Sequence, residues 1–428
     1  MVVLLSAVAL LPSSPAQADT RVMPGSITGY AFDTCQAPSQ RNMDAWLEAS
    51  PYWGVGIYIA GINRFCFNQP LLTPQWLQTQ SDNGWRILPL TVGLQASCST
   101  NARFQAPGRR INPNPAGDYA AARSQGGAEA RSTVSVARSL GIAAGSTLWY
   151  DLEHFDASKM RCRDSALAFI SGWTSQLHVS GYRSGFYSSG SSGIRALDNA
   201  RVLTPRRFDL PDQIWIADWN GRADVNSAYV RPDGWMPHAR VHQYRGDHLE
   251  TYGGVTINID SNFMDVGRGS VAPPEPSYCG GVSLNYPSYQ MLAPGSTGGQ
   301  VTATQCLLKL TGDYNGALGS AYTRETELAV RAYQSRHSLP VNGTMTASTW
   351  TALLSEGATP LIKFGSAEEA VRRLQRALNA SVGARLSVTG VFNAATTSAV
   401  RTYQANRGLP RTGVADPATW AGLRAGRR

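Results

Sequence analysis

The segment TLWYDLEH, residues 147–154, has the pattern of a buried strand that ends in two acidic residues. Asp151 and Glu153 are two positions apart, so an extended chain points both side chains to the same face. Seven more segments within residues 19–270 are rich in β-branched and aromatic residues. They span residues 26–34, 54–61, 86–93, 182–189, 213–220, 240–246 and 256–263. Helical patterns follow the first four strands and short irregular pieces join the last ones, which predicts an α/β fold, a (β/α)8-type barrel with a degenerate last third.

Polar side chains gather near the C-terminal ends of these predicted strands, where barrel enzymes hold their reactive groups. The residues are Asp33, Asp151, Glu153, Asp218, Gln243, Tyr244 and Asp260. Carboxylates crowded in a partly dry pocket cannot all ionise at low cost, so we expect a charged Asp151 to raise the pKa of Glu153 towards neutrality. One protonated and one ionised carboxyl group is the arrangement that glycoside hydrolysis uses.

Other interpretations of these acids remain open. Each of them, taken alone, could equally cap a helix or form an ion pair. An all-carboxylate pocket could also hold Ca²⁺ or Mg²⁺, but the sequence contains no spaced ligand loop. We therefore expect neither a metal nor another cofactor, and the prediction of catalysis depends on several acids falling at the same end of the barrel.

The C-terminal third contains two copies of one pattern. Val301, Gln305, Tyr333-Gln334 and Thr349-Trp350 recur at a constant offset of 70 positions (301 to 371, 350 to 420). Each copy predicts three helices, and in the second copy the third helix begins at Asp416-Pro417. Trp350 and Trp420 are expected in the core. The copies span residues 277–356 (repeat 1) and 357–428 (repeat 2), and the proline-rich residues 271–276 predict a semi-extended spacer before them.

The repeated pattern joins V-x-x-x-Q-x-x-L to A-V-x-x-Y-Q, L-P-x-x-G and T-W, and it resembles the peptidoglycan-binding domain type 1 family. The resemblance implies small helical modules that bind peptidoglycan or a related wall polysaccharide. Repeat 1 departs from the pattern, because Gly298-Gly299 stands where repeat 2 has Glu368-Glu369 and because it carries two extra cysteines. Its affinity is therefore expected to be the less secure of the two.

The barrel segments GYAFDTCQAPS, VGIYIAG, YDLEHF, SGFYSS, WIADWN, VHQYRG and NIDSNF are similar to the glycoside hydrolase-like domain of secreted actinobacterial proteins. More remotely, they resemble the family 25 lysozymes, which cleave peptidoglycan between N-acetylmuramic acid and N-acetylglucosamine. The resemblance implies Glu153 as proton donor, Asp151 as its partner and Asp33 on the pocket floor. It further implies pocket positions for Asp218 and Asp260 and sugar platforms at Trp219 and Tyr244, although rim packing would explain both aromatic residues equally well.

The six cysteines and the start of the chain indicate an oxidising compartment. Cys279 and Cys306 are predicted to pair; Cys35, Cys66, Cys98 and Cys162 allow three connectivities, of which pairing across neighbouring strand ends favours Cys35–Cys66 and Cys98–Cys162. Residues 1–18 hold the apolar run VLLSAVALL and an A-x-A site, which predicts a signal peptide, with an ordinary buried segment as the alternative.

The net charge of +9 is spread along the chain without a Lys/Arg-rich block, which argues against a nucleic-acid partner. A diffuse positive field suits anionic wall polymers, or it only aids solubility. After residue 18 no stretch approaches the ~20 apolar residues of a membrane helix. We therefore expect a secreted, wall-associated protein with no membrane span and no protein partner implied.

Three functions fit these observations: a glycosidase that acts on wall glycan, a wall-binding protein with an inactive barrel, and another wall hydrolase such as a peptidase. The six histidines form no H-E-x-x-H motif, which argues against a zinc peptidase. The even number of cysteines leaves no obvious free thiol for a cysteine peptidase. The sequence favours the glycosidase.

Overall fold

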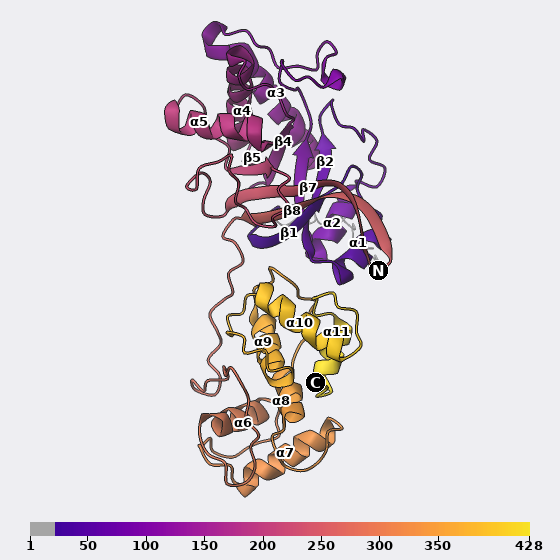
Figure 1. The fold of residues 1–428 in the computed structure, drawn as a ribbon, viewed down its shortest axis with the longest axis vertical. Helices are drawn as coiled ribbons and strands as arrows, with labels where there is room; N and C mark the ends of the chain where they lie inside the picture. The colour runs from indigo at the N-terminus through magenta and orange to yellow at the C-terminus, as the bar shows by residue number, and fades with distance from the viewer. Residues whose placement is uncertain (1–21) are drawn as a thin grey trace, which may run out of the picture.

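The computed structural model describes residues 22–428, so the predicted signal peptide lies outside the described residues. All eight predicted strands form, and they close into one barrel in chain order (Figure 1). The strands are β1 (Ile27–Asp33), β2 (Tyr52–Ala60), β3 (Arg86–Thr91), β4 (Thr147–Leu152), β5 (Arg183–Ser189), β6 (Gln213–Ala217), β7 (Ala239–Tyr252) and β8 (Val255–Val266). The predicted α/β barrel is confirmed.

Helices follow the first five strands, and none lies between β6 and β8 in the described chain. They are α1 (Gln40–Ala49), α2 (Pro74–Asp82), α3 (Ala116–Ser139), α4 (Met160–Val179) and α5 (Arg195–Leu203). Single turns at Ala102–Phe104 and Gly190–Ile194 complete the domain. The degenerate last third is therefore confirmed, whereas α5 was not predicted. Within residues 22–428, no helix is both long and apolar enough to cross a membrane.

The last strand reverses direction, which the sequence did not predict. β8 runs antiparallel to both β7 and β1, while the other neighbours are parallel. Only Gly253 and Gly254 separate β7 from β8, and both have positive φ angles, so this turn makes a hairpin and leaves no length for a crossover. Asp260 lies in the middle of β8, and the reversal places it opposite Asp33 at the end of β1.

Large side chains fill the barrel interior on the side away from the C-terminal ends of the parallel strands. Trp149 and Trp215 are fully buried there with their rings 5.5 Å apart. The Trp149 ring fits here only because residue 185 is glycine, since a Cβ atom at Gly185 would lie 2.4 Å from that ring. These side chains close the barrel at the N-terminal ends of its parallel strands. An open cleft can therefore form only at the opposite end, where the parallel strands β1 to β7 finish.

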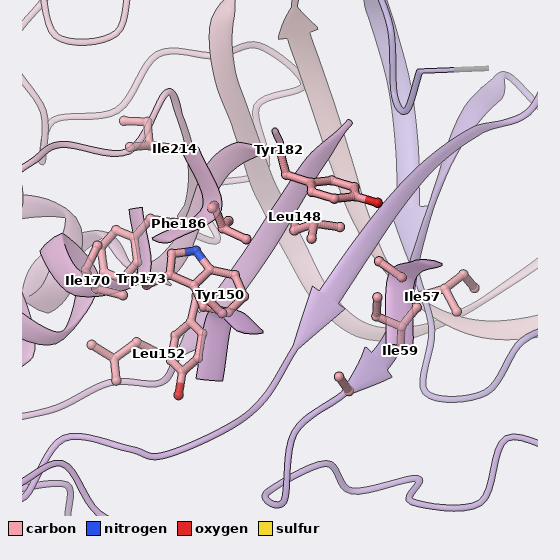
Figure 2. Packing of buried hydrophobic residues seen from close by; sticks show 14 of the residues in the cluster. Ile57, Ile59, Leu148, Tyr150, Leu152, Ile170, Trp173, Tyr182, Phe186 and Ile214 are labelled. Atoms are coloured by element: carbon pink, nitrogen blue, oxygen red, sulfur yellow. The ribbon is translucent and has the colours of Figure 1, made fainter. Parts of the chain in front are cut away.

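The outer face of β4 packs against α4. Leu148, Tyr150 and Leu152 belong to one buried cluster with Ile170 and Trp173 (Figure 2), and the rings of Tyr150 and Trp173 are 4.9 Å apart. Because side chains alternate along a strand, this packing turns Trp149 and Asp151 into the barrel. The apolar pattern of β4 thus fixes the direction of its acidic end.

The C-terminal region forms six helices, three in each repeat as predicted. Repeat 1 contains α6 (Gly299–Leu310), α7 (Arg324–Arg336) and α8 (Ala347–Leu354), and repeat 2 contains α9 (Glu369–Ser381), α10 (Ala394–Asn406) and α11 (Pro417–Arg424). Trp350 and Trp420 are fully buried, and their Nε1 atoms donate to the carbonyls of Gln290 and Pro360, each at 2.8 Å. The prediction of two core tryptophans is confirmed.

The repeats do not stand apart from each other or from the spacer. Their apolar residues form one shared core. Repeat 2 lies between the barrel and repeat 1, although it comes last in the chain (Figure 1). The spacer runs along α9, where Arg372 donates to the carbonyl of Pro273 and Arg376 pairs with Glu275. Residues 271–276 form neither helix nor strand, and these contacts hold them against repeat 2.

Three disulfides join all six cysteines in the predicted pairs. They are Cys35–Cys66, Cys98–Cys162 and Cys279–Cys306, with Cα–Cα distances of 5.6, 5.9 and 5.9 Å. The reason given for the pairing was partly wrong. Cys162 lies in the first turn of α4 and Cys66 in the loop between β2 and α2, so neither directly follows a strand.

Candidate active site

A cleft of about 450 Å³ opens at the end of the barrel where the parallel strands finish. Five carboxyl groups of the described chain line it, whereas Arg103 is the only basic side chain in this lining. The acids are Asp33 on β1, Asp151 on β4, Glu153 just after β4, Asp260 on β8 and Asp247 on β7. The predicted convergence of Asp33, Asp151, Glu153 and Asp260 is what the structure shows, and the reversal of β8 is the reason that Asp260 joins them.

Asp33 is buried at the centre of a hydrogen-bond network. Tyr58 Oη donates to its Oδ1 atom at 3.2 Å, and Gln243 Nε2 and Asn262 Nδ2 donate to Oδ2 at 3.1 and 2.8 Å. Gln243 Nε2 also lies 3.2 Å from Asp260 Oδ2, so one amide bridges the two acids. Burial and then the charge of Asp260 raise the pKa of Asp33 to about 7, against the opposing effect of its three donors.

Asp151 and Glu153 differ in how far water reaches them. Asp151 is buried, and its Oδ1 atom has no hydrogen-bond partner in the described chain. Its burial and then the charge of Glu153 raise the pKa of Asp151 well above its usual value. Glu153 is exposed to the cleft; the protein around it raises the pKa of this carboxyl, Arg103 lowers it and Asp260 raises it.

The expected charge distribution in this pair is therefore corrected. We expected a charged Asp151 to raise the pKa of Glu153. Instead, Asp151 is the more deeply buried acid and holds its proton more strongly, while Glu153 is the charge that acts on it. The physical reason is desolvation, which favours the neutral form of the carboxyl that is farther from water.

Gln95 fixes the backbone between the two acids. Its Nε2 atom donates to the carbonyl of Asp151 at 2.8 Å, and its Oε1 atom accepts from the backbone amide of Glu153 at 2.8 Å. Gln95 is fully buried, so both contacts are shielded from water. A single side chain thus holds Asp151 and Glu153 in position relative to each other.

Arg103 stands across the cleft from these acids on a loop after β3. Its guanidinium donates to the carbonyl of Asn63 and lies over the rings of Phe65 and Phe104, 5.2 and 5.8 Å from their centroids. These contacts hold the positive charge in place. It favours the ionised form of both Asp151 and Glu153.

Four of the predicted site residues do not line the cleft, and one of them, Gln243, is buried behind Asp33 and Asp260. Asp218 accepts from Ser227 Oγ at 2.8 Å and from Asn220 Nδ2 at 3.2 Å, so it organises the loop after β6. Trp219 is 64% exposed beside the cleft, where its Nε1 atom donates to Gln243 Oε1 at 2.9 Å. Tyr244 lies on the outer face of the barrel, because Gln243 points inward and neighbouring side chains on a strand alternate.

Several polar residues of the cleft region were missed, among them the acid Asp247 on β7. Tyr58, Tyr187 and Asn262 point inward from β2, β5 and β8, and Tyr187 Oη donates to Gln243 Oε1 at 3.0 Å. Residues two apart on a strand point to the same side, so the inward positions 56 and 260 could have indicated that residues 58 and 262 also point inward. Gln95 and Arg103 lie on a loop without such spacing, so no sequence signal pointed to them. Within residues 22–428, no three acidic, His or Cys side chains are grouped as a metal site requires.

Comparisons with known proteins agree with this architecture. A family model for the Rv2525c-like, glycoside hydrolase-like domain matches residues 44–264, a little more than half of the chain. A model for the putative peptidoglycan binding domain matches residues 297–353 and again 367–423. No curated protein matches the chain.

The solved structures that match the chain include three bacterial proteins. The Tat-secreted protein Rv2525c of Mycobacterium tuberculosis, in complex with L-tartrate, is 15% identical, with a TM-score of 0.37 over 56% of this chain and 98% of its own. A family 25 glycosyl hydrolase from Bacillus anthracis is 12% identical, with a TM-score of 0.34 over 60% and 96%. An uncharacterized B. stearothermophilus protein is 19% identical, with a TM-score of 0.33 over 55% and 95%. The family matches show that the chain belongs to the Rv2525c-like family of glycoside hydrolase-like domains, followed by two peptidoglycan-binding domains.

Proposed function

We propose that the barrel cleaves the glycan of the cell wall by carboxylate acid–base catalysis, while the two repeats hold the chain on peptidoglycan. The observation that carries this proposal is the convergence of Asp33, Asp151, Glu153 and Asp260 in one cleft that contains a single basic side chain. Membership of a glycoside hydrolase-like family supports it, as do the two peptidoglycan-binding domains. Three disulfides fit an exported protein that acts at the wall.

Glu153 is the proton donor in this mechanism. It is the member of the Asp151–Glu153 pair that is open to the cleft, so a glycosidic oxygen can reach it. Asp151 keeps a proton beside it, and burial together with the charge of Asp260 raises the pKa of Glu153, so that this carboxyl can hold the proton that it donates. As the bond breaks, Glu153 gives its proton to the leaving oxygen and positive charge develops on the sugar ring; a water molecule then attacks the anomeric carbon and its proton returns to Glu153. Asp33 and Asp260, bridged by Gln243, form the second carboxylate pair, which stabilises that charge in its ionised form.

The test measures release of reducing ends from purified peptidoglycan. Glu153→Gln keeps the size of the side chain but removes the labile proton, so the rate falls by ~10²–10⁴-fold while sedimentation with sacculi stays unchanged. Asp151→Asn, which keeps a neutral group beside Glu153, loses less. Asp82→Asn, an exposed acid at the end of α2 that does not line the cleft, serves as the matched control.

Equal rates for the wild type and Glu153→Gln would remove Glu153 from the mechanism. If the wild type releases no product from a range of wall glycans, the barrel is inactive and the protein only binds the wall. Sedimentation with sacculi separates the two functions, because it measures the repeats independently of the cleft.

A further inference from the structure

A second cavity of about 490 Å³ lies between the outer face of the barrel and repeat 2, away from the carboxylate cleft. The barrel supplies four tyrosines, Tyr30, Tyr52, Tyr244 and Tyr252, together with Glu250. Repeat 2 supplies the exposed side of α10, which faces the barrel (Figure 1), and the loop before α11. Interfaces between domains are common places for ligand sites, and a cavity of this size suits a small polar molecule.

Two guanidinium groups in the lining have no partner. Within residues 22–428, neither Arg401 nor Arg411 forms an ion pair or donates a hydrogen bond to the protein. Arg401 lines the cavity together with Tyr30 and Tyr252, and its charge lowers the pKa values of both tyrosines against the larger effect of burial. The only carboxylate in the lining, Glu250, is already engaged by Tyr52 Oη at 2.9 Å and His248 Nε2 at 3.0 Å.

Repeat 1 shows what an arginine at this position does when it has a structural role. Arg331, the counterpart of Arg401, pairs with Glu327 at 3.0 Å. Repeat 2 has Thr397 in place of that glutamate, and Thr397 itself lines the cavity. Repeat 2 also has Arg411 where repeat 1 has Val341. Ala394 and Lys363, which also line the cavity, replace Arg324 and Ala293 of repeat 1. Over all these positions repeat 2 is more positive than its sister module by two charges, one from the loss of Glu327 and one net from the changes at Arg411, Lys363 and Ala394.

We infer that this cavity is a binding site for a carboxylate-bearing wall fragment, a muramyl peptide. Guanidinium groups bind carboxylates with two parallel hydrogen bonds, and Arg401 and Arg411 are free to do so. The tyrosine rings and hydroxyls offer the amphipathic surface that a sugar ring with polar edges requires. The choice of a wall fragment rests on the proposed function, whereas the preference for an anion follows from the charges alone. Both domains line the site, so it exists only while repeat 2 is docked on the barrel. Binding of a wall fragment would therefore favour the docked arrangement.

The experiment titrates the full chain with N-acetylmuramyl-L-alanyl-D-isoglutamine by calorimetry. This probe has a free carboxylate and no glycosidic bond to cleave, so an inactive barrel does not affect the result. We expect Arg401→Gln/Arg411→Gln to bind at least ~10-fold more weakly, a loss of ~1.4 kcal/mol. Thr397→Glu restores the ion pair of repeat 1 and should weaken binding similarly without removing an arginine. Arg407→Gln, on the same module but outside the lining, should bind like the wild type.

Two results would overturn this inference. The first is equal affinity of the wild type and both altered chains for the probe, or no binding by the wild type. The second is that N,N′-diacetylchitobiose, which has no carboxylate, binds as tightly as the muramyl peptide. Loss of reducing-end release in Glu153→Gln with unchanged probe binding would show that the two sites act separately.

Discussion

The two ends of the barrel bury charges of opposite sign, and neither end pairs them fully. At the open end, five acids share a cleft with one arginine. At the closed end, Lys363 of repeat 2 is inserted between Trp53 and Trp85, where its Nζ atom donates to the carbonyl of Leu47 at 2.7 Å. No carboxylate in the described chain forms an ion pair with Lys363, and burial lowers its pKa well below the usual value.

The difference lies in what surrounds each charge. The acids border an open cleft that substrate and water can enter, so their raised pKa values are of use for proton transfer. Lys363 is buried between two domains at the edge of the second cavity, so its main effect is on how the domains dock. Repeat 1 has Ala293-Pro294 at the positions of Lys363-Phe364, so only repeat 2 has this contact. Phe364 adds to it, with its ring 5.0 Å from that of Tyr30.

After the loss of the proton donor Glu153, the largest expected effect on activity at the open end comes from Arg103, the one basic side chain of the cleft lining. Arg103 lowers the pKa of Glu153, so Arg103→Gln should raise that pKa and keep the acid protonated at higher pH. The alkaline limb of the kcat/KM profile should move up by about one pH unit, or ~10-fold in rate on that limb. Arg110→Gln, an exposed neighbour on the same loop, is the control. An unshifted profile in Arg103→Gln would show that Arg103 does not tune the donor.

Much of the fold was predictable, because strand patterns and the 70-position repeat are local features of the sequence. The direction of β8 was not, since it depends on a two-glycine turn whose meaning appears only when both strands are paired. The same turn places Asp260 beside Asp33. Residue types predicted the acids of the site, whereas Gln95 and Arg103 come from a loop with no periodic signal, and the domain interface at Lys363 required knowledge of which surfaces meet.

A smaller effect is expected at the closed end. Lys363→Ala removes the buried stem and its contact with Leu47, so repeat 2 should release the barrel for part of the time, at a cost of ~2 kcal/mol in docking. Small-angle X-ray scattering of Lys363→Ala should give a larger radius of gyration than that of the wild type. An added protease should also cut the chain within residues 267–277 faster. Lys363→Met keeps the stem and should remain docked. Lys309→Ala, a lysine of repeat 1, is the control. If Lys363→Ala and the wild type give the same scattering profile, Lys363 does not hold the interface.

The opposite charges also predict opposite dependences of docking and folding on pH. The pKa of Lys363 is lower in the folded chain than in the unfolded chain, so between these two values the unfolded chain binds more protons and stability rises with pH. Lys363→Met removes this dependence. Its stability relative to the wild type should therefore be greatest below the folded pKa of Lys363 and diminish towards pH 10.5.

The smallest expected effect has the reverse sign and concerns Asp151. Its pKa is higher in the folded chain than the usual 3.8, so above pH 4 the folded chain binds more protons and stability falls as pH rises through that window. Asp151→Asn keeps a neutral group of the same shape and does not titrate. The two proteins should melt together near pH 4, and at pH 7–8 Asp151→Asn should melt at least ~2 °C higher, equivalent to ~1 kcal/mol for a domain of this size. The same substitution keeps a neutral group beside Glu153, so it should reduce activity far less than Glu153→Gln does. A lower melting temperature of Asp151→Asn at pH 8 would mean that Asp151 is ionised and satisfied in the cleft, and the contrast between the two ends would fail.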